Sequence, residues 1–305
     1  MKWQTKLDWK LPQEDEINYN SSLVFIGSCF SDNLGNDFFS HGFRANVNPF
    51  GVLFNPFSIA NILKSDHEYW DKNRVVERDG KYVHLDAHSK VAGENESEVI
   101  SKLHSITDDL SQGLKTASHL FLTLGTAWVY ERDARVVANC HKQHPENFSR
   151  RLLGIDEILD ALSPAISGII NENPALKIYI TVSPIRHIKD GLIQNNRSKA
   201  RLLEVAHRIT EVFGNVNYLP AYELVMDELR DYRFYNDDLI HPSKAAVNYI
   251  LDYFMDHFFS AKTAEIYLRY EKLLKLQGHR QLLGDSKRAE KVKQVEEEIL
   301  RLKST

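Results

Sequence analysis

Short apolar runs, rich in β-branched and aromatic residues, recur along the chain, and each ends at a glycine, serine or proline. A largely apolar run of this length is typical of a strand buried on both faces, as in a parallel sheet. A weaker run, at residues 44–47, leads into Asn48-Pro49. The stronger runs are residues 23–26, 120–124, 177–182 and 216–219.

Segments with a helical period separate these runs. The alternation predicts βαβ units and a parallel sheet with helices on both faces. Ser31 and Asp32 are candidate caps for a helix that runs to about Phe39. In such a fold, ligands bind at the carboxyl ends of the strands. The apolar helical positions are Ile155, Ile158, Leu159, Leu162 and Ile166, then Leu202, Val205, Ala206 and Ile209, and later Ala246, Val247, Ile250 and Phe254.

Two regions differ from this pattern. Residues 64–95 are charged and contain Asp79-Gly80, which predicts an inserted hairpin, and we expect it to cover the site. From about residue 261, apolar positions recur among lysines and glutamates, which predicts two helices joined near 278–285. We therefore expect a main domain over residues 1–260 and a helical extension over 261–305. The extension would dock on the body or form a homo-oligomer contact.

Charge and composition exclude several classes of protein. The net charge of −4 gives no global basic field for nucleic acid, and the Lys/Glu run at 286–303 suits a solvated helix face. No stretch approaches 18 apolar residues, so we expect no membrane span. The N-terminal residues are charged, which argues against a secretory signal. Two cysteines cannot make a disulfide framework, so a reduced, cytoplasmic setting is expected.

Residues suited to nucleophilic catalysis lie at the predicted strand ends. Ser28 follows the first strand, and Asp238 precedes His241 by three residues, close enough in a loop to bond its ring. An imidazole can take the proton of a serine hydroxyl, and a carboxylate can orient that imidazole. Backbone N–H groups at Ser28, Gly51 and Gly125 could hold a developing oxyanion.

Each of these features alone has an ordinary interpretation. A serine after a strand is more often a helix cap, and Asp238 could be a cap or a surface ion-pair partner. Glycines such as Gly51 and Gly125 are more often turn formers. The case for catalysis depends on their occurring together, in this order, at predicted strand ends.

The chain resembles the GSCFA family, a branch of the SGNH/GDSL-like hydrolase superfamily, over roughly residues 21–255. The name motif appears at 27–31, with Ser31 where the family name has alanine. The other matching segments are 48–51 with 55–56, 124–128, 139–141, 183–187, and 231–235 leading to Asp238 and His241.

The resemblance implies a three-layer α/β/α, flavodoxin-like fold and serine-dependent ester hydrolysis without a cofactor. Ser28 matches the nucleophile, Gly51 the oxyanion glycine, His241 the base and Asp238 its partner. The superfamily has an oxyanion asparagine where this chain has Ala127. Losing one such donor can cost about 10²–10³ in rate. Either another donor substitutes, with Thr126, Asn139 and His141 as candidates, or the enzyme is slow, or the activity has been lost.

Other polar residues are candidates for substrate contacts. Asn139 and His141 are candidates because they lie in a segment that matches the family pattern, and His187 is one because it follows the fourth strand. Arg233 could bind an anionic substrate or pair with Asp231 or Asp237. Cys140, His141 and His144 are too few for a zinc signature, so no metal is expected.

The sequence therefore predicts a serine esterase that removes an acetyl or other short acyl group from a carbohydrate or small-molecule ester. Two alternatives stay open. One is a binding module that holds such a ligand without turning it over, and the other is an O-acyltransferase.

Overall fold

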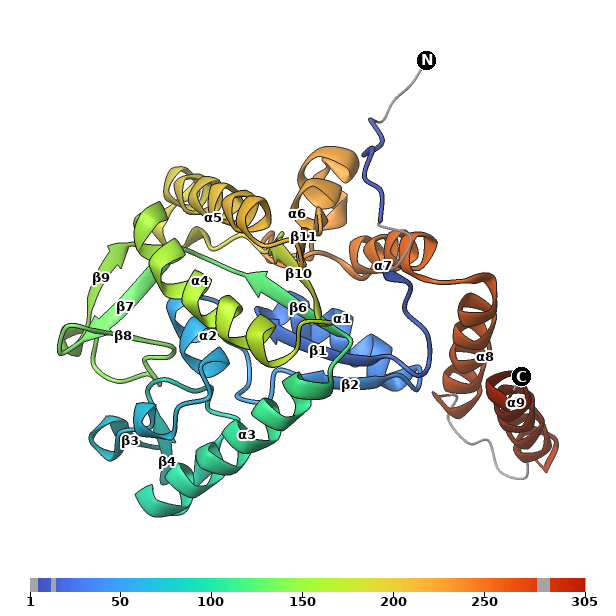
Figure 1. Ribbon diagram of the computed structural model, residues 1–305, viewed down its shortest axis with the longest axis horizontal. Helices are drawn as coiled ribbons and strands as arrows, with labels where there is room; N and C mark the ends of the chain where they lie inside the picture. Colours follow the sequence, from blue (N-terminus) through green and yellow to red (C-terminus); the bar gives the residue numbers. More distant parts are fainter. Residues whose placement is uncertain (1–4, 12–14, 279–285, 305) are drawn as a thin grey trace.

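A computed structural model describes residues 5–11, 15–278 and 286–304. Its central sheet has five parallel strands in the order β11-β10-β6-β1-β2 (Figure 1). Counted along the chain within this sheet, that is the doubly wound, flavodoxin-like order, whose switch point lies between β1 and β6. The expected parallel sheet is confirmed. Its strands are β1 (Ser22–Gly27), β2 (Arg44–Val47), β6 (His119–Leu124), β10 (Lys177–Val182) and β11 (Val216–Tyr218).

Helices cover both faces of this sheet, which confirms the three-layer prediction. Alternate strand residues point to opposite faces. Val24 and Leu122 pack in a cluster with α2 (Pro56–Leu63), α3 (Glu96–Thr116), α4 (Ile155–Glu172) and α5 (Leu192–Val212). Phe25 and Phe121 pack on the other face with α1 (Cys29–Ser40) and α7 (Lys244–Phe258).

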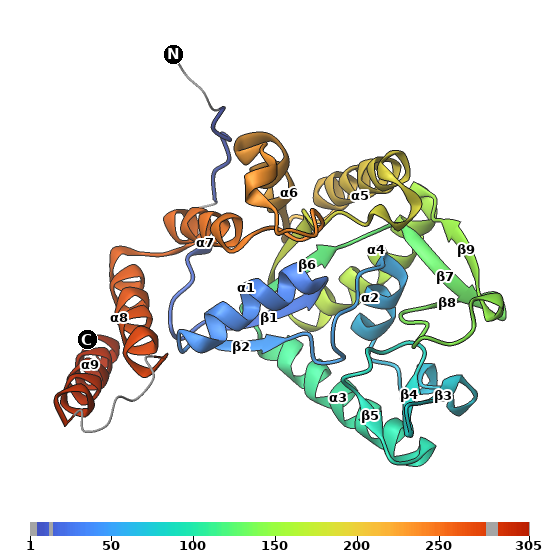
Figure 2. The same ribbon diagram turned by 180° about the vertical axis from the view of Figure 1, so that it is seen from behind.

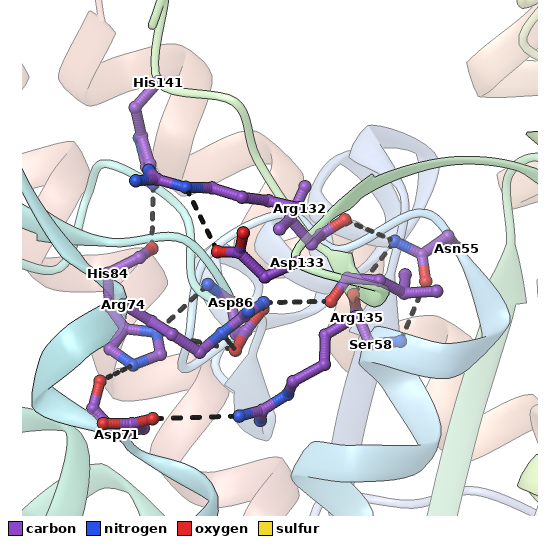
Figure 3. Close-up of polar contacts among 12 residues, drawn as sticks. Asn55, Ser58, Asp71, Arg74, His84, Asp86, Arg132, Asp133, Arg135 and His141 are labelled. Carbon is purple, nitrogen blue, oxygen red and sulfur yellow. Dashed lines mark hydrogen bonds and ion pairs between the residues drawn. The ribbon is translucent and has the colours of Figure 1, made fainter. Parts of the chain in front are cut away.

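The expected hairpin is present within residues 64–95. Strands β3 (Val75–Arg78) and β4 (Lys81–His84) pair antiparallel around Asp79-Gly80, and β5 (Ala92–Gly93) extends the sheet. A buried polar cluster fastens this insertion to the body (Figure 3). In it, Arg74 donates two hydrogen bonds of 2.6 Å to Asp86 and a third to the Val136 carbonyl.

A second small antiparallel sheet lies in a region where no strand was predicted from the sequence. It consists of β7 (Trp128–Arg132), β8 (Arg135–Val137) and β9 (Ser149–Leu152). Short helices complete the body: α6 (Ala221–Glu223), a π-helix over Leu224–Leu229, and 3₁₀ turns at His67–Tyr69, Lys72–Arg74, Pro145–Asn147, Ile188–Asp190 and Tyr232–Phe234.

At the end of the chain, α8 (Ala261–Gly278) and α9 (Ser286–Ser304) pack against each other, far from the β7–β9 sheet (Figures 1 and 2). The Tyr267 hydroxyl on α8 donates to Asp37 of α1 at 2.5 Å, which ties the pair to the body. The predicted junction near 278–285 falls mostly outside the described residues. The domain boundary and the oligomer contact stay predictions. In the described part of the chain, no helix combines the length and apolarity needed to cross a bilayer.

Candidate active site

Ser28 is the N-cap of α1, at the carboxyl end of β1. Its Oγ accepts a hydrogen bond of 3.2 Å from the Phe30 N–H, and the residue is 1% exposed. Gly27 precedes it with φ of +140°, and a Cβ there would lie 2.2 Å from the Thr123 carbonyl oxygen. Only glycine therefore allows β1 to run this close to β6. The predicted capping by Ser31 or Asp32 is wrong, because the helix begins earlier and Ser28 already caps it.

The turn that carries Gly51 is built around Asn48, which sequence reasoning did not single out as a site residue. Asn48 accepts a hydrogen bond of 2.8 Å from the Gly27 N–H through Oδ1 and donates through Nδ2 to Asp32 at 2.6 Å. This bonding ties the turn to the backbone beside Ser28. Gly51 has φ of +75°, and a Cβ there would lie 2.3 Å from the Cβ of His88. The insertion therefore packs against the Gly51 turn.

The four backbone N–H groups in the region of the expected oxyanion hole all have acceptors within the protein. Ser28 donates to the Thr123 carbonyl at 3.2 Å and Gly51 to the Asn48 carbonyl at 2.7 Å. Gly125 and Thr126 both donate to the Phe54 carbonyl, at 2.8 and 3.1 Å. These bonds fix the strand ends, and an oxyanion would have to share or displace them.

Lys199 lies beneath the Gly125 loop and was missed by sequence reasoning. This residue of α5 is 1% exposed, and its Nζ donates hydrogen bonds of 2.6 Å to the Gly125 and Ser183 carbonyls. Burial lowers the pKa of Lys199 to about 7. The neighbouring Ser198 accepts from the Ala127 N–H at 2.7 Å and bonds the Thr126 hydroxyl. One turn of α5 thus holds the ends of β6 and β10 together.

Asp238 and His241 lie side by side in a loop. The Nδ1–H of His241 donates to Asp238 Oδ2 at 2.7 Å, while Asp238 Oδ1 accepts from the backbone N–H groups of His241 and Ile240. These hydrogen bonds lower the pKa of Asp238 to about 2, and the one from the His241 backbone N–H contributes most. Because Nδ1 carries the proton in the pair, Nε2 of a neutral His241 is free to accept one.

The structure brings the His241 loop to the carboxyl end of the parallel strands, which is also where Ser28 lies. The Arg186 N–H, just past the end of β10, donates to the Ile240 carbonyl at 3.1 Å. Strands β10 and β1 lie on either side of β6, so their ends are about 10 Å apart. The hydrogen bonds described for Ser28 and His241 do not join the two side chains.

His187 follows β10 and lies next to the Gly125 loop. Its Nε2 is buried without a hydrogen-bond partner and lies 3.3 Å from where a Cβ on Gly125 would be. Burial lowers the pKa of His187 to about 3, helped by the positive charges of Lys199 and His241. The ring is therefore neutral near pH 7 and close to the Gly125 loop.

The remaining predicted substrate residues are more dispersed. His141 is 1% exposed, and its Nε2 donates to the His84 carbonyl at 2.8 Å (Figure 3). Asn139 accepts from the His141 N–H at 2.8 Å and lines a cavity near Phe54. Arg233 is exposed and pairs with Asp231 at 2.9 Å, the alternative left open by the sequence. In the residues covered by the structure, no group of three or more His, Cys, Asp or Glu could hold a metal ion.

Comparison with known proteins agrees with the motifs at this edge of the sheet. No curated protein matches the chain in sequence. A model of the GSCFA family matches residues 22–254, which include β1, β6, β10 and the Asp238–His241 loop. That span is well over half of the 305 residues. The chain therefore belongs to the GSCFA family.

Proposed function

We propose that this protein is a serine ester hydrolase of the SGNH/GDSL-like kind, with Ser28 as nucleophile, His241 as base and Asp238 as its partner. The observation that carries the proposal is the Asp238–His241 pair, docked at the same edge of a flavodoxin-like sheet as the Ser28 helix N-terminus. That edge, beside the switch point of the strand order, is where such sheets bind ligands.

In the proposed reaction, His241 Nε2 takes the proton of the Ser28 hydroxyl as Oγ attacks the ester carbonyl. The imidazolium then returns this proton to the leaving alcohol, and an acyl-enzyme remains on Ser28. Water repeats the sequence, giving up a proton to His241 and releasing the acid. Asp238, with its pKa near 2, stays ionised throughout and stabilises the imidazolium.

The chain needs donors for the oxyanion, because Ala127 offers no side-chain amide. The N-terminus of α1 contributes its dipole at Ser28. His187 supports the proposal as a further donor, since its neutral ring has an unpartnered Nε2 beside Gly125. A neutral imidazole can polarise a carbonyl without giving up its proton. Thr126, by contrast, already uses its hydroxyl to bond Ser198 and the Trp128 N–H.

A ligand-binding module is the second candidate function. It is favoured by the burial of Ser28 and by the acceptors already held by the Ser28, Gly51, Gly125 and Thr126 N–H groups. A short-chain or glycan ester would then bind at the sheet edge without reacting. An O-acyltransferase shares the acyl-enzyme, and an added alcohol acceptor would reveal it by forming a new ester.

Hydrolysis of 4-nitrophenyl acetate by the wild type, Ser28→Ala and Ser40→Ala tests the proposal. Ser40 is exposed at the end of α1 and serves as the matched control. We expect Ser28→Ala to lose at least about 10³ in kcat/KM, and Ser40→Ala to keep the wild-type rate. Thermal unfolding checks that both variants fold, because Ser28→Ala also removes a helix cap worth about 1 kcal/mol. Equal rates for all three proteins would refute the hydrolase.

A further inference from the structure

A cavity of about 340 Å³ opens beside the proposed active site. Aromatic side chains from three segments form part of its wall: Phe54 before α2, Tyr130 on β7 and Phe148 before β9. The free thiol of Cys140 also lines it. Its volume is at the lower end of the range for small-molecule sites, which suits a small, largely apolar group.

The charged residues that line this cavity are both lysines. Lys189 donates a hydrogen bond of 2.5 Å to the Tyr130 hydroxyl, and Lys142 is exposed at the rim without a carboxylate partner among the described ion pairs. The Arg150 guanidinium lies 4.8 Å from the centroid of the Tyr130 ring, and its carboxylate partner is Asp190. The four charged side chains carry a net charge of about +2 at neutral pH, because Lys142, Lys189 and Arg150 are positive and Asp190 is negative.

The positive field reaches the cavity interior. Burial raises the pKa of the Cys140 thiol, whereas the charges of Lys189 and Arg150 act in the opposite direction. Burial outweighs both charges, so the pKa of the thiol stays above its usual value and the two cations offset only part of that effect. A lysine at a partly desolvated, aromatic-lined rim is suited to bind a carboxylate or phosphate.

Phe54 connects the cavity to the reacting edge. Its carbonyl accepts the N–H groups of Gly125 and Thr126, and its ring centroid lies 5.6 Å from that of His187. A substrate with its ester at the sheet edge could therefore reach the cavity past the Phe54 ring. We propose that the cavity binds an anionic part of the substrate, namely a carboxylate or phosphate on an aromatic or short aliphatic group. Only the assignment of this anion to a substrate rests on the proposed function.

Reaction of Cys140 with charged methanethiosulfonates tests the cavity without any enzyme activity. The thiolate forms a disulfide with the reagent and methanesulfinate leaves, so no outside oxidant is needed. The negatively charged sulfonatoethyl reagent and the positively charged trimethylammonium-ethyl reagent are compared near pH 8.5, and mass spectrometry follows the Cys140 peptide. We expect the ratio of negative to positive reagent rates to exceed that of a free thiol peptide by about threefold to tenfold.

Substituting the lysines makes this test specific. Lys142→Gln with Lys189→Gln should return the rate ratio to that of the free peptide, while Lys115→Gln, an exposed lysine on α3, should leave it unchanged. A wild-type ratio equal to or below the peptide value would overturn the inference. So would a ratio that the double substitution does not lower.

Turnover of a charged and a neutral ester then tests whether the anion that binds in the cavity is part of the substrate. With 4-acetoxybenzoate and phenyl acetate as a charged and neutral pair, we expect the double lysine variant to raise KM about tenfold for the charged ester only. If Ser28-dependent turnover shows no effect of charge or of the lysines, the cavity role fails and the hydrolase stands. If turnover does not depend on Ser28, calorimetric binding of 4-acetoxybenzoate still decides the cavity role, with no binding overturning it.

Discussion

Ser28 and His241 lie at the same edge of the sheet, but Ser28 is 1% exposed whereas the His241 side chain is 46% exposed. Ser28 is held by bonds among buried groups: its N–H to Thr123, the Asn48 side chain to Gly27, and Lys199 to Gly125. His241 is held by Asp238 within its own loop and by the link from Ile240 to Arg186.

Burial thus fixes Ser28, the proposed nucleophile, whereas a short surface loop positions His241, the proposed base. Substitutions among the buried residues around Ser28 should therefore mainly lower the free energy of unfolding. Changes in the loop should appear first in activity, with little effect on folding. Four experiments test this division.

Asp238→Asn should have the largest effect, and only on activity. The amide cannot stabilise an imidazolium and favours the wrong imidazole tautomer, so we expect esterase kcat/KM to fall by about 10²–10⁴. Because Asp238 is exposed, Tm should stay within about 2 °C of the wild type. Asp237→Asn, one residue away and also exposed, is the control. A large loss of Tm, or unchanged activity, would contradict the division.

Lys199→Met should have the next largest effect, and on stability. The substitution leaves the Gly125 and Ser183 carbonyls buried without their donor, which should cost about 2–4 kcal/mol in urea unfolding near pH 10, where the protonation of Lys199 costs the folded state little. Lys64→Met, at the exposed end of α2, should stay within about 0.5 kcal/mol of the wild type. A loss below about 1 kcal/mol for Lys199→Met would mean that this lysine does not hold the strand ends.

Protonation of Lys199 should also make the free energy of unfolding depend on pH. The pKa of Lys199 is lowered from 10.5 to about 7 in the folded state, so between these values the unfolded chain binds more protons. Stability should therefore rise with pH across this window, by up to about 1.4 kcal/mol per pH unit, and this contribution should fall away as pH drops towards 7. Subtracting the Lys199→Met curve isolates it, and parallel curves would count against a depressed pKa.

Arg186→Ala should have the smallest effect. The guanidinium donates to the Leu239 carbonyl at 3.1 Å and lies 5.5 Å from the ring centroids of Tyr232 and Tyr235. Its loss should speed amide hydrogen exchange at residues 236–241 and lower kcat/KM about threefold to tenfold, because the backbone bond to Ile240 remains. Unchanged exchange in this loop would show that Arg186 does not restrain it.

Much of the fold could be predicted because apolar runs such as 23–26 and 120–124 carry a strong periodic signal. The Asp79-Gly80 hairpin was equally legible, since its turn requires positive φ at both residues. Strands β7 and β9 were missed because they carry Glu131, Arg132 and Arg150, whose charges hide the strand pattern. The cap of α1 was misplaced because Ser31 and Asp32 are as suitable for a cap as Ser28.

For the site, the sequence predicted that Asp238 bonds the ring of His241, which the structure shows, but it could not assign the hydrogen-bond partners of the residues at the strand ends. Nothing in the local pattern distinguishes Lys199 from the solvated lysines of other helices, since its burial depends on how α5 packs against β6 and β10. Nor could spacing show that Gly125 and Thr126 already donate to the Phe54 carbonyl. Such long-range pairings depend on the fold and leave no periodic trace.

Labelling with a fluorophosphonate probe tests whether His241 activates Ser28. The probe phosphonylates a serine only when a base removes its proton, and mass spectrometry identifies the labelled peptide. We expect labelling at Ser28 in the wild type and its loss in His241→Ala. Folded wild-type protein that stays unlabelled, or His241→Ala that labels as fast as the wild type, would show that His241 does not activate Ser28.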